Sequence, residues 1–130
     1  MPKIALTAIE STVATALEAH GAAPAVAASV ARAVRVAEAK GNKICGLYYV
    51  ESYCRQLVSG RVHGTVDPVV THEKAGAVRV DAGFGFAQPA FAAGFDEAGE
   101  AAKAGGACGH SIEHSHTCTT LGCFTEQPAE

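Results

Sequence analysis

Apolar residues in the first sixty positions recur every three or four residues, which is the spacing of one face of an α-helix. The first run ends at Gly21, and its apolar face consists of Leu6, Ile9, Val13, Ala16 and Leu17. The second begins at Pro24, a residue suited to the first turn of a helix, and ends at Gly41-Asn42. The third covers about residues 46–59, and its apolar face consists of Leu47, Val50, Cys54, Leu57 and Val58. The pattern predicts three successive helices.

Beyond Gly60 the pattern changes to short stretches rich in β-branched residues, which are typical of strands. Residues 69–71 and 77–81 predict two strands, joined by a polar turn at residues 72–76. Residues 107–112 predict a third strand. The chain therefore offers a small sheet of three short strands.

The order of the elements indicates the fold class. An alanine-rich helix is expected at about residues 89–104, between the second and third strands, and helical signal returns near Thr120. Because helices come first and strands then alternate with helices, we predict a mixed α/β class. We divide the chain into a helical N-terminal segment, residues 1–62, and the start of a small α/β unit, residues 63–130. A sheet of only three short strands leaves edges uncovered. We therefore expect this unit to be incomplete, which means that it is truncated or needs a partner.

Composition narrows the class of protein. The 130 residues are 48% apolar and 18% charged, with a net charge of −3, which allows a collapsed core and excludes a disordered chain. The acidic balance argues against nucleic-acid binding. No apolar run approaches the ~18 residues of a membrane helix, and the N-terminus lacks the pattern of a signal peptide. Five cysteines, an odd number, favour reduced thiols in a cytoplasmic protein over a disulfide scaffold.

Potential metal ligands are densest between residues 110 and 123. This stretch contains His110, His114, His116, Cys118 and Cys123. Imidazole and thiolate groups suit zinc, but the spacing matches no closed zinc motif because it lacks a Cys-x-x-Cys pair. One hypothesis is a small metal-binding module that uses the three histidines and Cys118. The favoured one is a polar loop at the edge of a cleft, so we assign no metal ligand.

Two other segments have features of functional loops. Residues 83–89 are glycine-rich and precede a helix, as phosphate-binding loops do, but they lack the lysine of a P-loop and the Gly-x-Gly-x-x-Gly spacing. A tight turn is therefore the favoured interpretation. Cys45 follows Lys43 near the start of a predicted helix, and both features make a thiol more nucleophilic. The alternative for Cys45 is a small apolar residue in the core.

Three blocks of sequence follow one another in a specific order. They are Ala37-Glu38-Ala39-Lys40-Gly41 with Cys45-Gly46-Leu47 and Tyr53, then Val80-Asp81-Ala82 with Gly85-Phe86-Ala87-Gln88-Pro89-Ala90, then Ser115-His116-Thr117-Cys118-Thr119-Thr120-Leu121-Gly122. Together they resemble the malate/L-lactate dehydrogenase family, whose NAD(P)-dependent reductases are not built on a Rossmann fold. The resemblance extends from about residue 6 to residue 130 and corresponds to the N-terminal third of the family's length.

This resemblance implies reduction of 2-oxo acids, or of cyclic imino acids, by hydride transfer from NAD or NADP. The family's general acid–base histidine falls at Cys45, and its carboxylate-binding arginine falls at Tyr49. A second family histidine falls at Thr117, one residue after His116. We expect His116 and Cys45 to be the catalytic residues. Tyr49, Ser115 and Thr117 are expected to contact the substrate.

The sequence leaves three hypotheses open. In the first, the protein is a truncated or partial oxidoreductase of this family that acts on a small 2-oxo or 2-hydroxy acid, with most of the cofactor-binding residues beyond the equivalent of residue 130. In the second, it is a non-catalytic remnant or an assembly subunit. The third is the His/Cys metal-binding module. We expect a homo-oligomer or a complementing chain as partner, and neither nucleic acid nor membrane.

Overall fold

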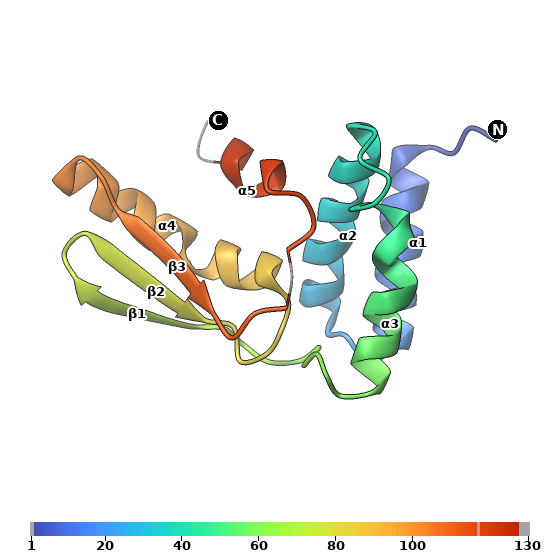
Figure 1. The fold of residues 1–130 in the computed structure, drawn as a ribbon, viewed down its shortest axis with the longest axis horizontal. Coiled ribbons are helices and arrows are strands. Elements are labelled where there is room, and N and C mark those ends of the chain that lie inside the picture. The colour runs from blue at the N-terminus through green and yellow to red at the C-terminus, as the bar shows by residue number, and fades with distance from the viewer. Residues whose placement is uncertain (1, 117, 128–130) are drawn as a thin grey trace.

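Three helices that lie side by side form the N-terminal half of the structure (Figure 1). The computed structural model describes residues 2–116 and 118–127. The helices are α1 (Leu6–Ala19), α2 (Pro24–Ala39) and α3 (Val50–Val58), and a short 3-10 helix, η1 (Leu47–Tyr49), precedes α3. Their buried side chains, among them Leu17, Val30 and Val34, pack into one apolar cluster. The first two predicted helices are confirmed closely.

The C-terminal half is a three-stranded sheet with one long helix against it (Figure 1). Its elements are β1 (Val69–Lys74), β2 (Ala77–Asp81), α4 (Ala87–Gly105), β3 (Gly109–Glu113) and α5 (Gly122–Glu126). The strand order is β1-β2-β3, with β1 antiparallel and β3 parallel to β2. A parallel pair needs a crossover connection, which α4 provides. The mixed α/β class is confirmed.

The sheet has its own small core, which α4 covers. Val78 and Val80 of β2 are buried together with Ala82 and Ala90, whereas the intervening Arg79 points to the open face of the sheet. Such alternation is expected of a strand with one covered face. Phe86, directly before α4, packs into the helical cluster instead and links the two cores. The boundary at residues 62 and 63 stays a prediction.

The third helix differs from the prediction. The expected helix at residues 46–59 is divided into η1 and α3, and the side chains of Leu47 and Val58 are 43% and 71% exposed. The tighter 3-10 turn changes the angle between successive side chains, so Leu47 leaves the apolar face. Val58 is the last residue of α3 and follows Leu57, the last buried residue of that helix.

The hairpin between β1 and β2 is tighter than expected. β1 continues through His72 to Lys74, residues predicted to form the turn, because Lys74 still pairs with Ala77. A register shift between His72 and Lys74 accommodates the extension.

Among the helices that the structure describes, none combines the length and the apolar character that crossing a membrane requires.

Candidate functional site

A cavity of about 270 Å³ lies where the helical half meets the loop that follows β3. Its lining residues are Ile44, Cys45, Tyr49, Ser52, Tyr53, Gln56, His116, Cys118 and Thr119. Cys45, Tyr49 and His116, which the sequence analysis assigned to one site, therefore line the same cavity. Residues more than 60 positions apart in the sequence are brought together by the fold.

The cavity wall that contains Cys45 is fixed by the end of α2. The Glu38 carboxylate accepts a hydrogen bond from the Leu47 backbone N–H at 2.8 Å, and the Asn42 side-chain oxygen accepts one from the Cys45 N–H at 3.3 Å. Gly46 lies so close to Glu38 that a Cβ atom there would be 2.2 Å from the carboxylate oxygen. A glycine therefore allows the chain to turn tightly around Glu38 and to present Cys45 to the cavity.

Tyr53 is the most buried aromatic side chain of the cavity, with 3% exposure. Its ring stacks on Tyr49 at 6.2 Å between centroids and meets Phe86 and His116 edge-on at 5.6 and 5.7 Å. Burial raises the pKa of Tyr53 to about 12, and the nearby Cys45, Tyr49 and Cys118 add to the rise. Tyr53 thus keeps its proton at neutral pH and is a hydrogen-bond donor. Tyr53 lies within the first of the three sequence blocks, but its position in that block indicates no role.

His116 is held by its backbone and by two aromatic rings. Its backbone N–H donates to the Gly85 carbonyl at 2.8 Å, and its ring contacts Phe86 as well as Tyr53. Farther along the same loop, the hydroxyl of Thr119 accepts a hydrogen bond from the Gln88 side chain at 3.4 Å, a buried contact with α4. The loop is therefore attached to the body of the protein on both sides of Cys118.

Ser115 lies on the other side of His116, in a second cavity of about 410 Å³. The two cavities share His116 and Cys118, and the second also reaches Phe91, His110 and Phe124. Thr117, the remaining predicted substrate contact, lies outside the described residues.

The glycine-containing turn before α4 is not a phosphate cradle. The N–H of Gly83 donates to the Asp81 carboxylate at 2.8 Å, that of Phe84 to the His114 carbonyl at 2.7 Å, and that of Gly85 to the Ala82 carbonyl at 2.8 Å. With all three donors used inside the protein, none is directed at a ligand. The interpretation of this segment as a tight turn is confirmed.

The three histidines near the C-terminus point to different surroundings. His110 stacks on Phe91 at 5.2 Å, His116 lines the cavity, and His114 lies on the open face of the sheet. His114 adopts a left-handed backbone conformation with φ of 49°, which ends β3 and separates it from His116. The proposed metal module of His110, His114, His116 and Cys118 is therefore not assembled.

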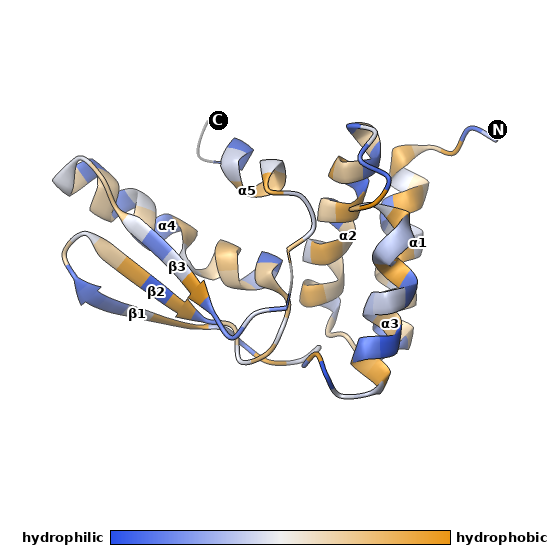
Figure 2. Cartoon of the chain, in the orientation of Figure 1, coloured by the Kyte–Doolittle hydropathy of each residue, from blue (hydrophilic) through white to orange (hydrophobic). Residues whose placement is uncertain are grey.

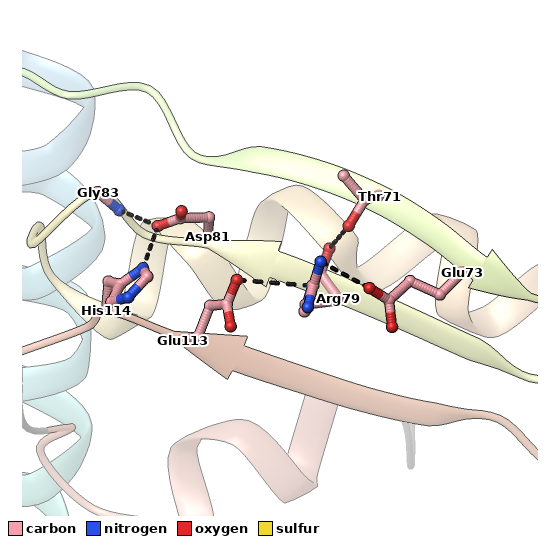
Figure 3. A network of polar contacts seen from close by, with 7 residues as sticks. All are labelled: Thr71, Glu73, Arg79, Asp81, Gly83, Glu113 and His114. Carbon is pink, nitrogen blue, oxygen red and sulfur yellow. Dashed lines mark hydrogen bonds and ion pairs between the residues drawn. The ribbon is translucent and has the colours of Figure 1, made fainter.

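Instead, His114 Nδ1 donates a hydrogen bond to the Asp81 carboxylate, with 3.1 Å between the two atoms; this contact is drawn in Figure 3. Glu113 lies within 4.8 Å of both and also pairs with Arg79. The hydrogen bond from the Gly83 N–H, followed by that to His114, holds the pKa of Asp81 below its usual range. Each acidic group already has a partner in the protein, so we interpret this network as contacts that join the ends of β2 and β3.

Neither cavity suits a complete nicotinamide dinucleotide. The first cavity, of about 270 Å³, is below the usual range of ~300–1,000 Å³ for drug-sized ligands, whereas the second, of about 410 Å³, is within that range. Among the described residues, no lysine or arginine lines either cavity. A dinucleotide would bring a pyrophosphate, which needs such cations or free backbone N–H groups. The first cavity has the size and the polar donors for a small organic acid.

Comparison with known proteins agrees with this picture. The sequence matches the family described as malate/L-lactate dehydrogenase over residues 4–130. The chain belongs to this family. It is 34% identical over 128 residues to a Δ1-pyrroline-2-carboxylate/Δ1-piperideine-2-carboxylate reductase of Pseudomonas putida, and 37% identical over 111 residues to one of Pseudomonas syringae pv. tomato. These matches cover 98% and 85% of the chain, but only 38% and 32% of the relatives.

Solved structures give the same result. The structure superposes on the Δ1-piperideine-2-carboxylate reductase of P. syringae with a TM-score of 0.93 at 31% identity, covering 98% of this chain and 38% of that one. A putative malate/lactate dehydrogenase from E. coli has a TM-score of 0.89 at 22% identity, with 99% and 36% covered, and so shares the fold. This family member corresponds to the N-terminal part of such proteins and spans less than two-fifths of their length.

Proposed function

We propose that this chain forms the substrate-binding and proton-transferring part of a reductase that converts a cyclic imino acid or a 2-oxo acid with NAD(P)H. The observation that supports this most is the convergence of Cys45, Tyr49, Tyr53 and His116 on one cavity of about 270 Å³. The two Pseudomonas relatives are reductases of five- and six-membered cyclic imino acids. Such small planar acids match a cavity of this size.

The chemistry of this reduction requires a proton donor next to the reacting double bond. When hydride adds to carbon, the imine nitrogen or the carbonyl oxygen must receive a proton. His116 is the cavity residue suited to supply it near neutral pH, because an imidazole titrates there. Tyr53 keeps its proton and orients the substrate by a hydrogen bond, and Cys45 and Tyr49 also line the cavity.

The cofactor belongs, in this proposal, to polypeptide beyond this chain. Among the described residues, no lysine or arginine lines the cavities of about 270 and 410 Å³, and the relatives are more than twice as long as this chain. Polypeptide that corresponds to the rest of the relatives' length would provide the cofactor site.

Complementation of activity tests the proposal. The chain is mixed with the C-terminal part of the P. syringae reductase that lies beyond the matched region, and NADPH oxidation is followed with Δ1-piperideine-2-carboxylate or pyruvate. The reductase's own N-terminal part, supplied as a separate chain, is the positive control. We expect turnover that depends on both polypeptides. If the two chains associate and the control pair is active, but this chain gives no turnover with either substrate, the proposal is wrong.

That negative result would support a second candidate, a non-catalytic assembly subunit. In its favour, the family resemblance implies that Cys45 and Tyr49 fall at the positions of the family's histidine and arginine. Neither side chain replaces a carboxylate-binding cation, and the cavity lining contains no lysine or arginine.

A further inference from the structure

A third cavity, of about 340 Å³, lies between α2, α4 and α5. Its polar lining residues come from four helices: Glu10 of α1, Ser29 and Arg32 of α2, Gln88 of α4 and Cys123 of α5. None of these five residues lines the first cavity, of about 270 Å³. We call this third cavity the Arg32 cavity. Its volume is within the usual range of ~300–1,000 Å³ for small-molecule sites.

Gln88 is almost fully buried in the wall of the Arg32 cavity, with 6% exposure. It belongs to the start of α4, which shows a hydrophilic band close to α2 in Figure 2. Its Nε2 donates a hydrogen bond to the Thr119 hydroxyl at 3.4 Å, but its Oε1 has no hydrogen-bond partner among the described residues. An unpaired buried oxygen is unfavourable, because its lost hydrogen bonds to water are not replaced. The wall therefore offers an acceptor for a ligand that donates a hydrogen bond.

Arg32 provides a positive charge to the same cavity. Its side chain forms no ion pair with a described residue, whereas the Glu10 carboxylate pairs with Arg35 Nε at 2.6 Å. Burial raises the pKa of the Cys123 thiol, and the positive charge of Arg32 opposes that rise. The guanidinium thus acts on the cavity wall as well as on the solvent. A guanidinium without a protein partner is suited to bind a carboxylate through two parallel hydrogen bonds.

We infer that the Arg32 cavity is a binding site for a small α-amino acid. Such a molecule carries a carboxylate for Arg32 and, on the adjacent carbon, an ammonium group that donates to Gln88 Oε1 and is attracted by Glu10. A simple carboxylic acid would leave the Gln88 oxygen without a partner, and a simple amine would leave Arg32 unpaired. The site therefore selects a ligand that has both groups. The inference concerns binding outside the first cavity, so it stands independently of the proposed reaction.

Isothermal titration calorimetry with three probes of similar shape tests the inference. L-Proline carries both groups, cyclopentanecarboxylate lacks the nitrogen, and pyrrolidine lacks the carboxylate. We expect L-proline to bind about tenfold more tightly than either of the other probes, because each of them lacks one charge-assisted hydrogen bond. Equal affinity for the three probes would overturn the inference, and so would failure of L-proline to bind.

Substitutions identify the groups that hold the ligand. Arg32→Gln should weaken binding of L-proline about tenfold and leave binding of pyrrolidine unchanged. Arg61→Gln is the matched control, because Arg61 is also an exposed arginine and lines none of the three cavities. Gln88→Met keeps the length of the side chain without the amide, and should abolish the preference for L-proline over cyclopentanecarboxylate. Equal weakening by the two arginine substitutions would contradict the inference.

Backbone amide chemical shifts distinguish the Arg32 cavity from the first cavity. Addition of L-proline should shift the amide signals of residues 28–32 and 88–92, and Arg32→Gln should suppress these shifts. Thermal unfolding of each variant verifies that it is folded. Shifts confined to residues 44–53 would place the ligand in the first cavity and overturn the inference.

Discussion

The imidazole ring of His116 stands edge-on against the phenol ring of Tyr53, with 5.7 Å between the centroids and 90° between the planes. His116 comes from the loop after β3 and Tyr53 from α3, so this contact joins the two halves of the protein at the cavity. The first three predictions concern residues of this region and its surroundings.

Loss of the Tyr53 ring should destabilise the protein strongly, whereas loss of its hydroxyl alone should not. Tyr53→Ala removes three aromatic contacts from a buried site and should cost about 3–5 kcal/mol. Tyr53→Phe keeps the rings in place and should remain within about 1 kcal/mol of the wild type at pH 7. Urea denaturation checks both values. Similar losses for both variants would mean that the hydroxyl, and not the ring, is the structural element.

The raised pKa of Tyr53 predicts that the protein loses stability at alkaline pH. The folded protein holds Tyr53 neutral up to about pH 12, while the unfolded chain ionises from about pH 10. Stability should therefore decrease as the pH rises above 10, and less so in Tyr53→Phe. Parallel stability curves for wild type and variant between pH 9 and 11 would contradict this.

A basic side chain at position 49 should improve binding of a carboxylate substrate. Tyr49→Arg introduces a guanidinium into a cavity whose lining has no lysine or arginine, and a charge-assisted hydrogen bond should lower KM about tenfold in the complemented enzyme. Tyr48→Arg is the control, because Tyr48 is 76% exposed and does not line the cavity. An equal effect of both variants would indicate general electrostatic attraction instead.

Two glycines of α4 should respond to alanine in opposite directions. A Cβ atom at Gly94 would lie 2.6 Å from both His110 Nε2 and Val80 Cγ2, so Gly94→Ala should cost about 1–3 kcal/mol. At Gly99 nothing lies within 4 Å, and Gly99→Ala should stabilise the helix by about 0.5–1 kcal/mol. Thermal unfolding distinguishes the signs; a stable Gly94→Ala variant would show that His110 moves freely.

The burial of His110 predicts that the protein loses stability in mild acid. Burial lowers the pKa of His110 in the folded protein, so below about pH 6.5 the unfolded chain takes up a proton that the native state resists. The free energy of unfolding should thus decrease as the pH falls from 6.5 to 5. His110→Gln should reduce this slope, and an unchanged slope in that variant would contradict the prediction.

The helices and strands of this fold could be predicted from the sequence because the apolar pattern of each one lies within its own segment. The stripe from Leu6 to Leu17 forms α1, and the alternation around Val78 and Val80 forms β2. Leu47 was misplaced because a 3-10 turn breaks the helical period. The separation of His114 from His116 depends on a left-handed residue that local pattern does not reveal.

The candidate site was only partly predictable. Cys45, Tyr49 and His116 were assigned together from family resemblance, and they line one cavity. Tyr53 was not assigned because its character comes from burial among rings of three different segments. Such an environment is defined by tertiary contacts, which have no signature in the sequence around Tyr53.

The proposed function assigns the proton transfer to His116, in a reaction that also needs polypeptide corresponding to the rest of the relatives' length. It is tested most directly by kcat of the complemented enzyme with His116→Ala and with His114→Ala, measured on Δ1-piperideine-2-carboxylate. His116 lines the cavity, and His114 lies outside it beside Asp81. We predict a loss of about 10²–10⁴-fold for His116→Ala and at most a few-fold for His114→Ala. Equal and small effects of the two substitutions would contradict the assignment of His116 and make Cys45 the next residue to test.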